Sequence, residues 1–331
     1  MKKFLSLILF GLVLTGCGNG VSSSASVSEN SQNSIEQNPN STSKEEPSVT
    51  PQLVDLDKLK EQYGTFDVTT EKGNPGVLSS DGKTYTISVS SSKSAYSISG
   101  YFEGQIIINN DSDLSSIKGV ELTLNNACIV SQNGPTISYQ VDDKNVEIVA
   151  KKNTENYIIN LGEGNDDSAV DSEKNIELDG KGVLNIITKT GHALKAKKKI
   201  RFYDNFTLNI VSGHDAIHAN EFIANNEEGS PEDYEEFIGT LNVLSAVSQA
   251  FDCTTSSGTG YVDLSSGTYN ISNCESVFKT DYSLVIGGQV VATNLTGEPV
   301  VRGDNSNGIS IEITDTGSFT VDGVNYTKTN I

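Results

Sequence analysis

Residues 182–186 read GVLNI, and close variants of this stretch recur later in the chain. The variants are FTLNI at 206–210, GTLNV at 239–243 and GTYNI at 267–271. Their asparagines, at positions 185, 209, 242 and 270, are therefore 24, 33 and 28 positions apart. A β-type motif that recurs at such a period, with loops of variable length between the copies, predicts a solenoid in which each repeat forms one coil.

A second short strand follows in each repeat. These strands read AVDS at 169–172, ALKA at 193–196, AIHA at 216–219, AFDC at 250–253 and VFKT at 277–280. Because side chains alternate between the two faces of a strand, the second and fourth residue of each should point inward. The third residues should form one outward stripe, made of Asp171, Lys195, His218, Asp252 and Lys279. By the same alternation, the asparagine column should also face outward.

From about residue 65 onward the chain consists of short β-rich runs punctuated by Gly, Asn, Asp and Ser, with no convincing long helix. We therefore expect an all-β fold, a right-handed parallel β-helix formed as a single-stranded solenoid. It should have roughly seven to nine coils stacked about 4.8 Å apart. In LVDLDKLKEQYG at 53–64, Leu53, Leu56, Leu59 and Tyr63 have helical spacing. This segment predicts a short N-terminal helix that caps one end of the domain, residues 53–331.

The N-terminus has the features of an exported, lipid-anchored protein. Lys2 and Lys3 precede an apolar run at 4–14, which is typical of a signal peptide. The following LTGC at 14–17 resembles the lipobox of bacterial lipoproteins, which implies a signal peptide of residues 1–16 and a lipid chain, such as palmitate, on Cys17. Residues 17–52 are Ser- and Asn-rich and lack aromatic residues, so they should form a disordered tether. We expect the protein on the extracellular face of a bacterial membrane.

The net charge limits the possible partners. The chain has 23 Lys and Arg against 43 Asp and Glu, which gives −20, and loss of Lys2 and Lys3 with the leader gives −22. So acidic a surface repels phosphate backbones and argues against nucleic-acid binding. Transporter-type solute-binding lipoproteins are also disfavoured, because their α/β lobes need many helices. We expect a monomer that contacts the membrane through its lipid anchor only.

Three segments carry a resemblance to a known family. YSISGYFEGQIIIN at 96–109, VELTLNN at 120–126 and NTENYIIN at 153–160 resemble the β-helical carbohydrate-binding domain of bacterial surface lipoproteins. That family is related in fold to the pectate-lyase superfamily, and the resemblance covers about residues 85–300. It implies binding of polysaccharides, acidic ones included, and bound calcium.

The resemblance also bears on candidate metal ligands. The family's repeats carry Asp-Gly-Ile or Asp-Ala-Ile; Asp215-Ala216-Ile217 matches, and Asp167-Ser168-Ala169-Val170 is a looser version. The acid is replaced by His192, Gln249 and Ser276 in the other repeats. Asp166, Asp167 and Asp171 lie in the oxygen-rich turn GEGNDDSAVDS at 162–172, a type of turn that can hold calcium. The resemblance adds Asp215 to these candidate calcium ligands.

All three histidines, His192, His214 and His218, lie in two neighbouring repeats near Asp215. One interpretation is a metal or acid–base cluster on one face. The other is a set of solvated polar side chains on an outer strand. We favour the second interpretation, because the spacing matches no zinc signature.

Residues 189–201 carry six basic residues and no acid, whereas residues 225–238 carry six acidic residues and no base. The basic segment predicts either a site for an anionic polymer or a surface that the acidic segment covers. The candidate carbohydrate-binding residues are Lys195, Lys197, Lys198, Lys199 and His218. In a polysaccharide lyase, Lys195 would instead be the base that abstracts the proton α to a uronate carboxylate.

Three cysteines remain after Cys17, namely Cys128, Cys253 and Cys274. The odd number argues against a complete disulfide framework, although a Cys253–Cys274 bridge stays possible. The leading hypothesis is a non-catalytic surface lipoprotein that binds polysaccharide, an acidic one by preference and with calcium as a possible aid. The alternatives are a calcium-dependent uronan lyase and a structural or adhesive surface protein without a sugar site.

Overall fold

A computed structural model describes residues 54–89, 93–110, 119–141, 144–164, 168–224 and 235–327. All of these residues belong to one compact unit, Glu46–Ile331. The predicted signal peptide, Cys17 and the tether at 17–52 lie outside the described residues, as do Asp166 and Asp167. Within the described part of the chain, no helix has the length and apolarity that crossing a membrane requires.

The chain winds through three sides of a solenoid in each coil. The first side carries β8 (Asn145–Ala150), β11 (Asn175–Gly180), β14 (Lys199–Phe202), β17 (Glu221–Ile223), β20 (Tyr261–Leu264), β23 (Ser283–Ile286) and β26 (Ser310–Ile313). The second side carries β9 (Glu155–Asn160), β12 (Val183–Thr188), β15 (Thr207–Ser212), β18 (Thr240–Ala246), β21 (Thr268–Cys274), β24 (Gln289–Leu295) and β27 (Ser318–Val321). The third side carries β3 (Thr84–Val89), β5 (Gln105–Asn110), β7 (Ile137–Tyr139), β10 (Val170–Ser172), β13 (Leu194–Ala196), β16 (Ile217–Ala219), β19 (Gln249–Cys253), β22 (Ser276–Thr280) and β25 (Val300–Arg302).

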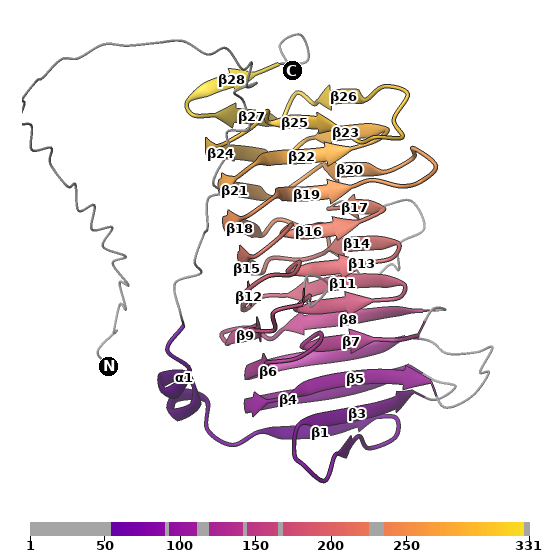
Figure 1. Cartoon of the computed structure of the whole chain (residues 1–331), viewed down its shortest axis with the longest axis vertical. Coiled ribbons are helices and arrows are strands. Elements are labelled where there is room, and N and C mark those ends of the chain that lie inside the picture. Colours follow the sequence, from indigo (N-terminus) through magenta and orange to yellow (C-terminus); the bar gives the residue numbers. More distant parts are fainter. Residues whose placement is uncertain are drawn as a thin grey trace, which may run out of the picture. The chain divides into compact units, whose positions relative to one another are not determined.

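Two long strands start the stack. β4 (Ser94–Glu103) and β6 (Val120–Ser131) each run along the first two sides, because β6 pairs with β8 through its first half and with β9 through its second. Nine strands stack in parallel along the second side, which makes nine coils among the described residues. They are β4, β6, β9, β12, β15, β18, β21, β24 and β27. Figure 1 shows the coils following one another from indigo to yellow. The predicted parallel solenoid is confirmed, and its right-handedness stays a prediction.

The register confirms the two predicted strand columns. On the third side Val170, Leu194, Ile217, Phe251 and Phe278 face one another from coil to coil, and all five are fully buried. On the second side Asn185, Asn209, Asn242 and Asn270 are in register and face outward. The amides of Asn209, Asn242 and Asn270 each donate to the side-chain oxygen of the preceding asparagine, at 2.8, 2.8 and 2.9 Å.

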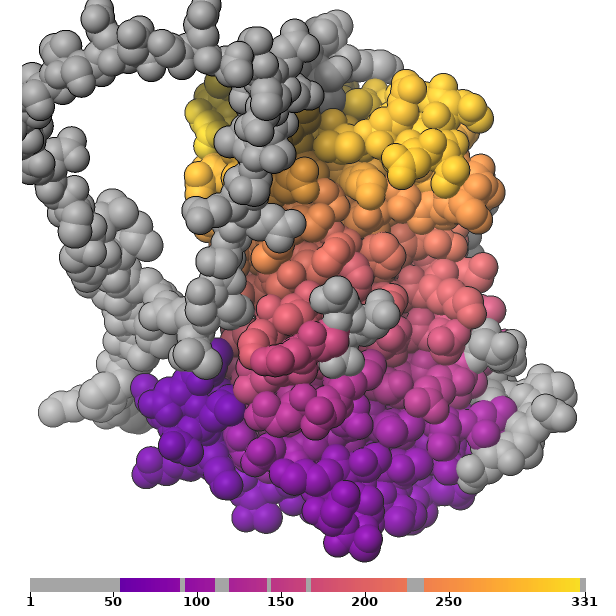
Figure 2. All heavy atoms as spheres, in the orientation of Figure 1, coloured from indigo at the N-terminus to yellow at the C-terminus, as the bar shows by residue number. Residues whose placement is uncertain are grey.

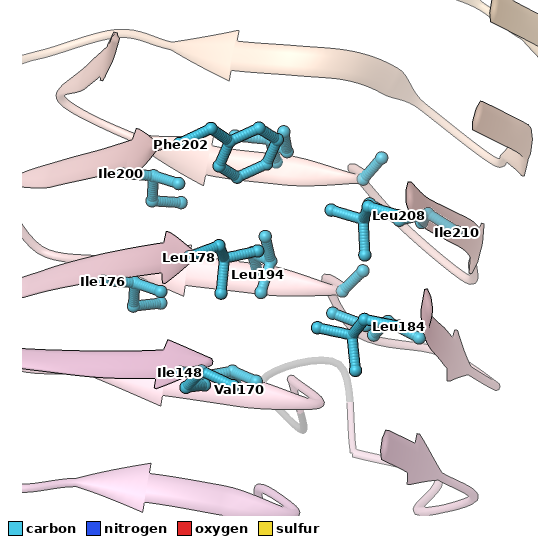
Figure 3. Close-up of a cluster of buried hydrophobic side chains, with 14 of the residues drawn as sticks. Ile148, Val170, Ile176, Leu178, Leu184, Leu194, Ile200, Phe202, Leu208 and Ile210 are labelled. Carbon is cyan, nitrogen blue, oxygen red and sulfur yellow. The ribbon is translucent and has the colours of Figure 1, made fainter. Parts of the chain in front are cut away.

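The inward side chains of all three sides pack together in one apolar core. Figure 3 shows Ile176 and Leu178 of β11, Leu184 of β12 and Leu194 of β13 pointing toward the same interior. The next coil stacks Ile200, Phe202 and Leu208 on them. Because each coil buries its apolar side chains against the coils on either side, stability depends on the neighbours as much as on the coil itself.

Both ends of the stack carry antiparallel strands. β1 (Asp67–Lys72) pairs antiparallel with β4, and β2 (Val77–Leu78) pairs antiparallel with β3. At the other end, β28 (Val324–Tyr326) folds back antiparallel on β27. These strands occupy edges that would otherwise offer unpaired backbone groups to a second chain.

The predicted helix is present, but it does not cap the open end. α1 (Leu56–Tyr63) starts at Asp55, whose carboxylate accepts from the Lys58 backbone N–H at 3.1 Å. Leu59 packs on Cys128, Val130 and Ile159, which face outward from β6 and β9 on the second side. The position follows from these apolar side chains, because an outward apolar patch on the flank needs cover. The prediction of a capping helix is therefore corrected to a helix on the flank.

The cysteines are packed thiols. Cys128, Cys253 and Cys274 are all buried and free, so the possible Cys253–Cys274 bridge is absent. Burial raises the pKa of the Cys128 thiol to about 12, and it raises that of Cys274 to about 12 as well. All three thiols therefore stay protonated and unreactive at neutral pH.

Because the coils stack through their buried side chains, substitutions inside the solenoid should cost more stability than substitutions on its surface. Phe251 is fully buried, with the rings of Phe222 and Phe278 at centroid distances of 5.0 and 5.4 Å. Phe251→Ala should lower the free energy of unfolding by about 3–5 kcal/mol, because it opens a cavity between coils. The control Asn209→Ala removes only outward amide hydrogen bonds and should cost about 1 kcal/mol. Urea unfolding measures both, and equal costs would contradict a core that stacks at Phe251.

Candidate functional site

The outward residues of the third side form the predicted stripe, here called the third-side strip. Asp171 faces Lys195, Lys195 faces His218, His218 faces Asp252, and Asp252 faces Lys279 on successive coils. Asp252 is nevertheless buried, because Lys279 and Thr254 close over its carboxylate. The Lys279 ammonium lies 3.2 Å from Asp252 Oδ2, and the Thr254 hydroxyl donates to Oδ1 at 2.8 Å.

A cluster of four side chains lies at the margin of this strip, where the second side turns into the third. His192, His214, Asp215 and His218 make up this histidine–aspartate cluster. The Nδ1 atom of each histidine lies 3.2 Å from Oδ2 of Asp215. The His192 ring lies 4.6 Å from that of His214 and 4.4 Å from that of His218, between centroids.

Successive coils bring these residues together. His192 and Asp215 occupy the same position in neighbouring repeats, each two residues before the third-side strand begins. The Ala193 N–H donates to the Asp215 carbonyl at 3.2 Å, which sets the two turns side by side. The Gln249 backbone N–H, from the next coil, donates to Asp215 Oδ1 at 3.0 Å and leaves Oδ2 facing the histidines.

Burial separates the four side chains into two kinds. The side chains of Asp215 and His192 are only 1% and 9% exposed, whereas those of His214 and His218 are 48% and 37% exposed. The interpretation of the histidines as solvated side chains, which the sequence favoured, is therefore wrong for His192. It also misses the buried carboxylate on which all three rings converge.

The electrostatics follow from this arrangement. Burial by itself would raise the pKa of Asp215, but the three imidazoles outweigh it and hold the pKa well below its ordinary value. Burial lowers the pKa of His192, although Asp215 opposes the effect. Contact with Asp215 raises the pKa of His214. At neutral pH the cluster therefore contains an ionised carboxylate and a neutral His192 ring.

In two overlapping sets of residues, the donor atoms lie close enough together to hold an ion. They are the only such sets among the residues that the structure describes. One set is His192, His214 and Asp215, and the other is Asp215, His218 and Asp252. Sequence reasoning placed Asp252 on the stripe but did not join it to the histidines. The shared repeat position of His192 and Asp215 was the signal that could have identified the cluster.

The predicted calcium set is not assembled in the described part of the chain. Asp166 and Asp167 lie outside it, and Asp171 is two coils from His218, roughly 10 Å along the stack. Asp215 instead faces imidazole nitrogens, which calcium does not take as ligands. Across the described ranges, neither donor set consists of carboxylates alone. With Asp166 and Asp167 outside the described residues, calcium at this turn stays a prediction.

The basic segment does not form one patch. Lys195 lies on the third side and Lys199 on the first, while Lys197 and Lys198 lie in the turn between them. Acids of adjacent coils pair with several members of the segment. The pairs are Lys189–Glu163 at 2.7 Å, Lys197–Glu173 at 2.9 Å, Lys199–Glu221 at 2.6 Å and Arg201–Glu177 at 3.6 Å. The candidate carbohydrate-binding set is thus divided, with Lys195 and His218 adjacent on the strip and Lys199 on another side.

Residues 225–234 of the acidic segment lie outside the described residues. In the remaining part, Glu235 pairs with Lys181 at 3.4 Å, and Asp204 pairs with the same lysine at 3.3 Å. Lys181 lies in the turn between the first and second sides, and it is not a member of the basic segment. These contacts give no support to the acidic segment as a cover for the basic one.

A polar hollow of about 300 Å³ lies at the same corner of the solenoid, in the first coils. Its lining includes Lys83, Glu103, Gln105, Ser131 and Asn133. These residues surround the turns that lead from β4 to β5 and from β6 to β7, as the cluster's turns lead to β13 and β16. The hollow and the cluster therefore lie along one corner, between the second and third sides.

Comparisons with known proteins agree with this fold. The sequence matches the family described as carbohydrate-binding domain-containing protein over residues 81–327. A solved structure, described as a polysaccharide lyase-like protein from C. thermocellum in a gadolinium derivative, is similar with a TM-score of 0.56 and 15% sequence identity. The similarity covers 77% of this chain and 95% of that one, and at this identity it shows the fold alone. No curated protein matches the sequence. The chain belongs to the family of carbohydrate-binding domain-containing proteins.

Proposed function

We propose that this protein is a non-catalytic module that binds an acidic polysaccharide along the third-side strip. Its membership of a carbohydrate-binding family supports the class of ligand. The in-register strip is the observation that carries the location, because it repeats polar groups at every coil from Asp171 to Lys279. The surface of the domain is likewise a succession of coils, as the ordered colours of Figure 2 show.

The geometry suits a polymer better than a small ligand. Strip positions follow one another at the spacing of stacked strands, about 4.8 Å, so an extended chain can meet the same kind of contact on each coil. The strip and the polar hollow lie on or beside one corner, which lengthens the available track. Lys195, with Lys198 at the other margin of the strip, supplies positive charge for carboxylates of the glycan.

The proposed function includes a lipid anchor at the N-terminus. A diacylglyceryl group on Cys17 would hold the solenoid at the outer face of a bacterial membrane, with residues 17–52 as the tether. The resemblance of residues 14–17 to a lipobox supports this location. An exported acidic domain with a polymer-binding flank is suited to holding the cell to a polysaccharide, or the polysaccharide to the cell.

A polysaccharide lyase is the second candidate, and one observation favours it. Lys195 is directly beside His218, and His218 contacts Asp215 in the histidine–aspartate cluster. A base beside a cation-binding group is the arrangement that proton abstraction next to a carboxylate requires.

Binding should depend on Lys195. We expect Lys195→Ala to weaken binding of the full-length protein to polygalacturonate about tenfold, because a charge-assisted contact is lost. Lys181→Ala, at the opposite corner, is the matched control and should bind as the wild type does. Affinity is measured by calorimetry in detergent solution, with absorbance of unsaturated products followed in the same sample.

Three outcomes decide between the functions. Loss of binding in Lys195→Ala alone, without new absorbance, supports the binding module. If the wild type releases unsaturated product and Lys195→Ala does not, the lyase replaces the binding module as the proposed function. Equal binding by both variants, or no binding to charged and uncharged glycans alike, would contradict a site on the third-side strip.

Anchoring is tested separately at Cys17. In a bacterial host with lipoprotein processing, we expect Cys17→Ser to remove incorporation of labelled palmitate and to release the protein from the membrane fraction. Cys128→Ser, at a buried thiol, is the control and should leave labelling unchanged. Palmitate that persists in Cys17→Ser would contradict the lipid anchor.

A further inference from the structure

The histidine–aspartate cluster has a geometry that ordinary surface hydrogen bonding does not account for. Three Nδ1 atoms, from His192, His214 and His218, each lie 3.2 Å from the same oxygen of Asp215. A carboxylate oxygen offers about two lone pairs, so three imidazoles exceed what it accepts comfortably. Only His218 meets the angular requirements of a hydrogen bond among the pairs with Oδ2 that the structure records.

His192 is the residue that this arrangement leaves unsatisfied. Its side chain is more than nine-tenths buried, and its Nδ1 atom has no hydrogen-bond partner. Buried polar atoms in folded proteins nearly always have a partner. The Nδ1 atom nevertheless lies 3.2 Å from the one oxygen that the other two rings also approach, so a partner for it belongs within the cluster.

The distances are those of ligands around a small cation. With bonds of about 2.0–2.1 Å to nitrogen and oxygen, two ligand atoms of a tetrahedral zinc site lie about 3.3 Å apart. The three Nδ1–Oδ2 distances in the cluster, each 3.2 Å, are close to this value. The donor atoms of His192, His214 and Asp215 also lie within 4.8 Å of one another, as the ligands of one ion would, whereas His218 belongs to the second set with Asp215 and Asp252.

Surrounding contacts hold the donors in place, as the outer shell of a metal site does. The Gln249 N–H fixes Asp215 through Oδ1 and leaves Oδ2 to face the histidines. Asp252, a member of the second donor set, is itself held by Lys279 and Thr254. His214 and His218 are partly exposed, so an ion can enter from solvent.

We propose that His192, His214 and Asp215 form a binding site for a zinc-class transition-metal dication, with a water as the further ligand and His218 beside the shared Asp215 oxygen. Imidazole nitrogens together with a carboxylate oxygen suit Zn²⁺ and its first-row neighbours, whereas Ca²⁺ and Mg²⁺ take oxygen ligands. The ion ties together the turns that precede β13 and β16, beside the third-side strip. This site does not depend on carbohydrate binding, and either proposal can fail without the other.

The test titrates Zn²⁺ into the metal-stripped full-length protein in detergent, with Ca²⁺ in a parallel sample. We expect saturable binding of one Zn²⁺ per chain, unaffected by a large excess of Ca²⁺. Co²⁺ in place of Zn²⁺ should give the visible absorption of a four-coordinate site. Because the chain has only three histidines, its imidazole NMR signals report on this cluster alone, and all three should shift.

Variants locate the site. Asp215→Asn and His214→Ala should each weaken Zn²⁺ binding at least tenfold. His214 is half-exposed, so its variant should keep the metal-free unfolding midpoint of the wild type even if Asp215→Asn does not. Asp171→Asn makes the same change two coils away on the strip and should bind Zn²⁺ normally. Absence of saturable Zn²⁺ binding, or an equal loss in Asp171→Asn and His214→Ala, would overturn the proposal.

Discussion

In-register parallel pairing between successive coils is the constraint on which the rest of this structure depends. Each third-side strand hydrogen-bonds to its equivalent in the next coil, so a position in one repeat lies directly above the same position in the previous one. This stacking places Phe251 on Phe278 inside the solenoid and Asp252 beside Lys279 outside it. The core and the candidate binding surface are thus two faces of one ladder.

Features that the ladder repeats from coil to coil were predictable from the sequence. Period-two alternation within AIHA and AFDC predicts Ile217 and Phe251 inside and His218 and Asp252 outside. The structure confirms the first three, and Asp252 is buried beneath Lys279 and Thr254. The asparagine column was equally predictable, because in-register stacking brings equivalent amides within hydrogen-bonding distance. These features need only the repeat and the alternation of a strand, both of which are visible in one sequence.

Features that depend on turns or on single coils were not predictable in the same way. His192 and His214 lie in turns, whose conformation decides whether their rings reach Asp215. Lys195 and Lys199 are close in sequence, yet the chain turns a corner between them and puts them on different sides. The helix lies on the flank because Cys128 and Val130 face outward there, in a long strand without the repeat motif.

We propose that polysaccharide binds along the third-side strip. Hydrogen–deuterium exchange on the full-length protein, with and without polygalacturonate, tests this location. We expect added protection on the strands and turns of the third side, at residues 189–198, 213–219, 247–253 and 276–280. Protection on the first side, at β11, β14 and β17, or no change anywhere at saturating glycan, would contradict it.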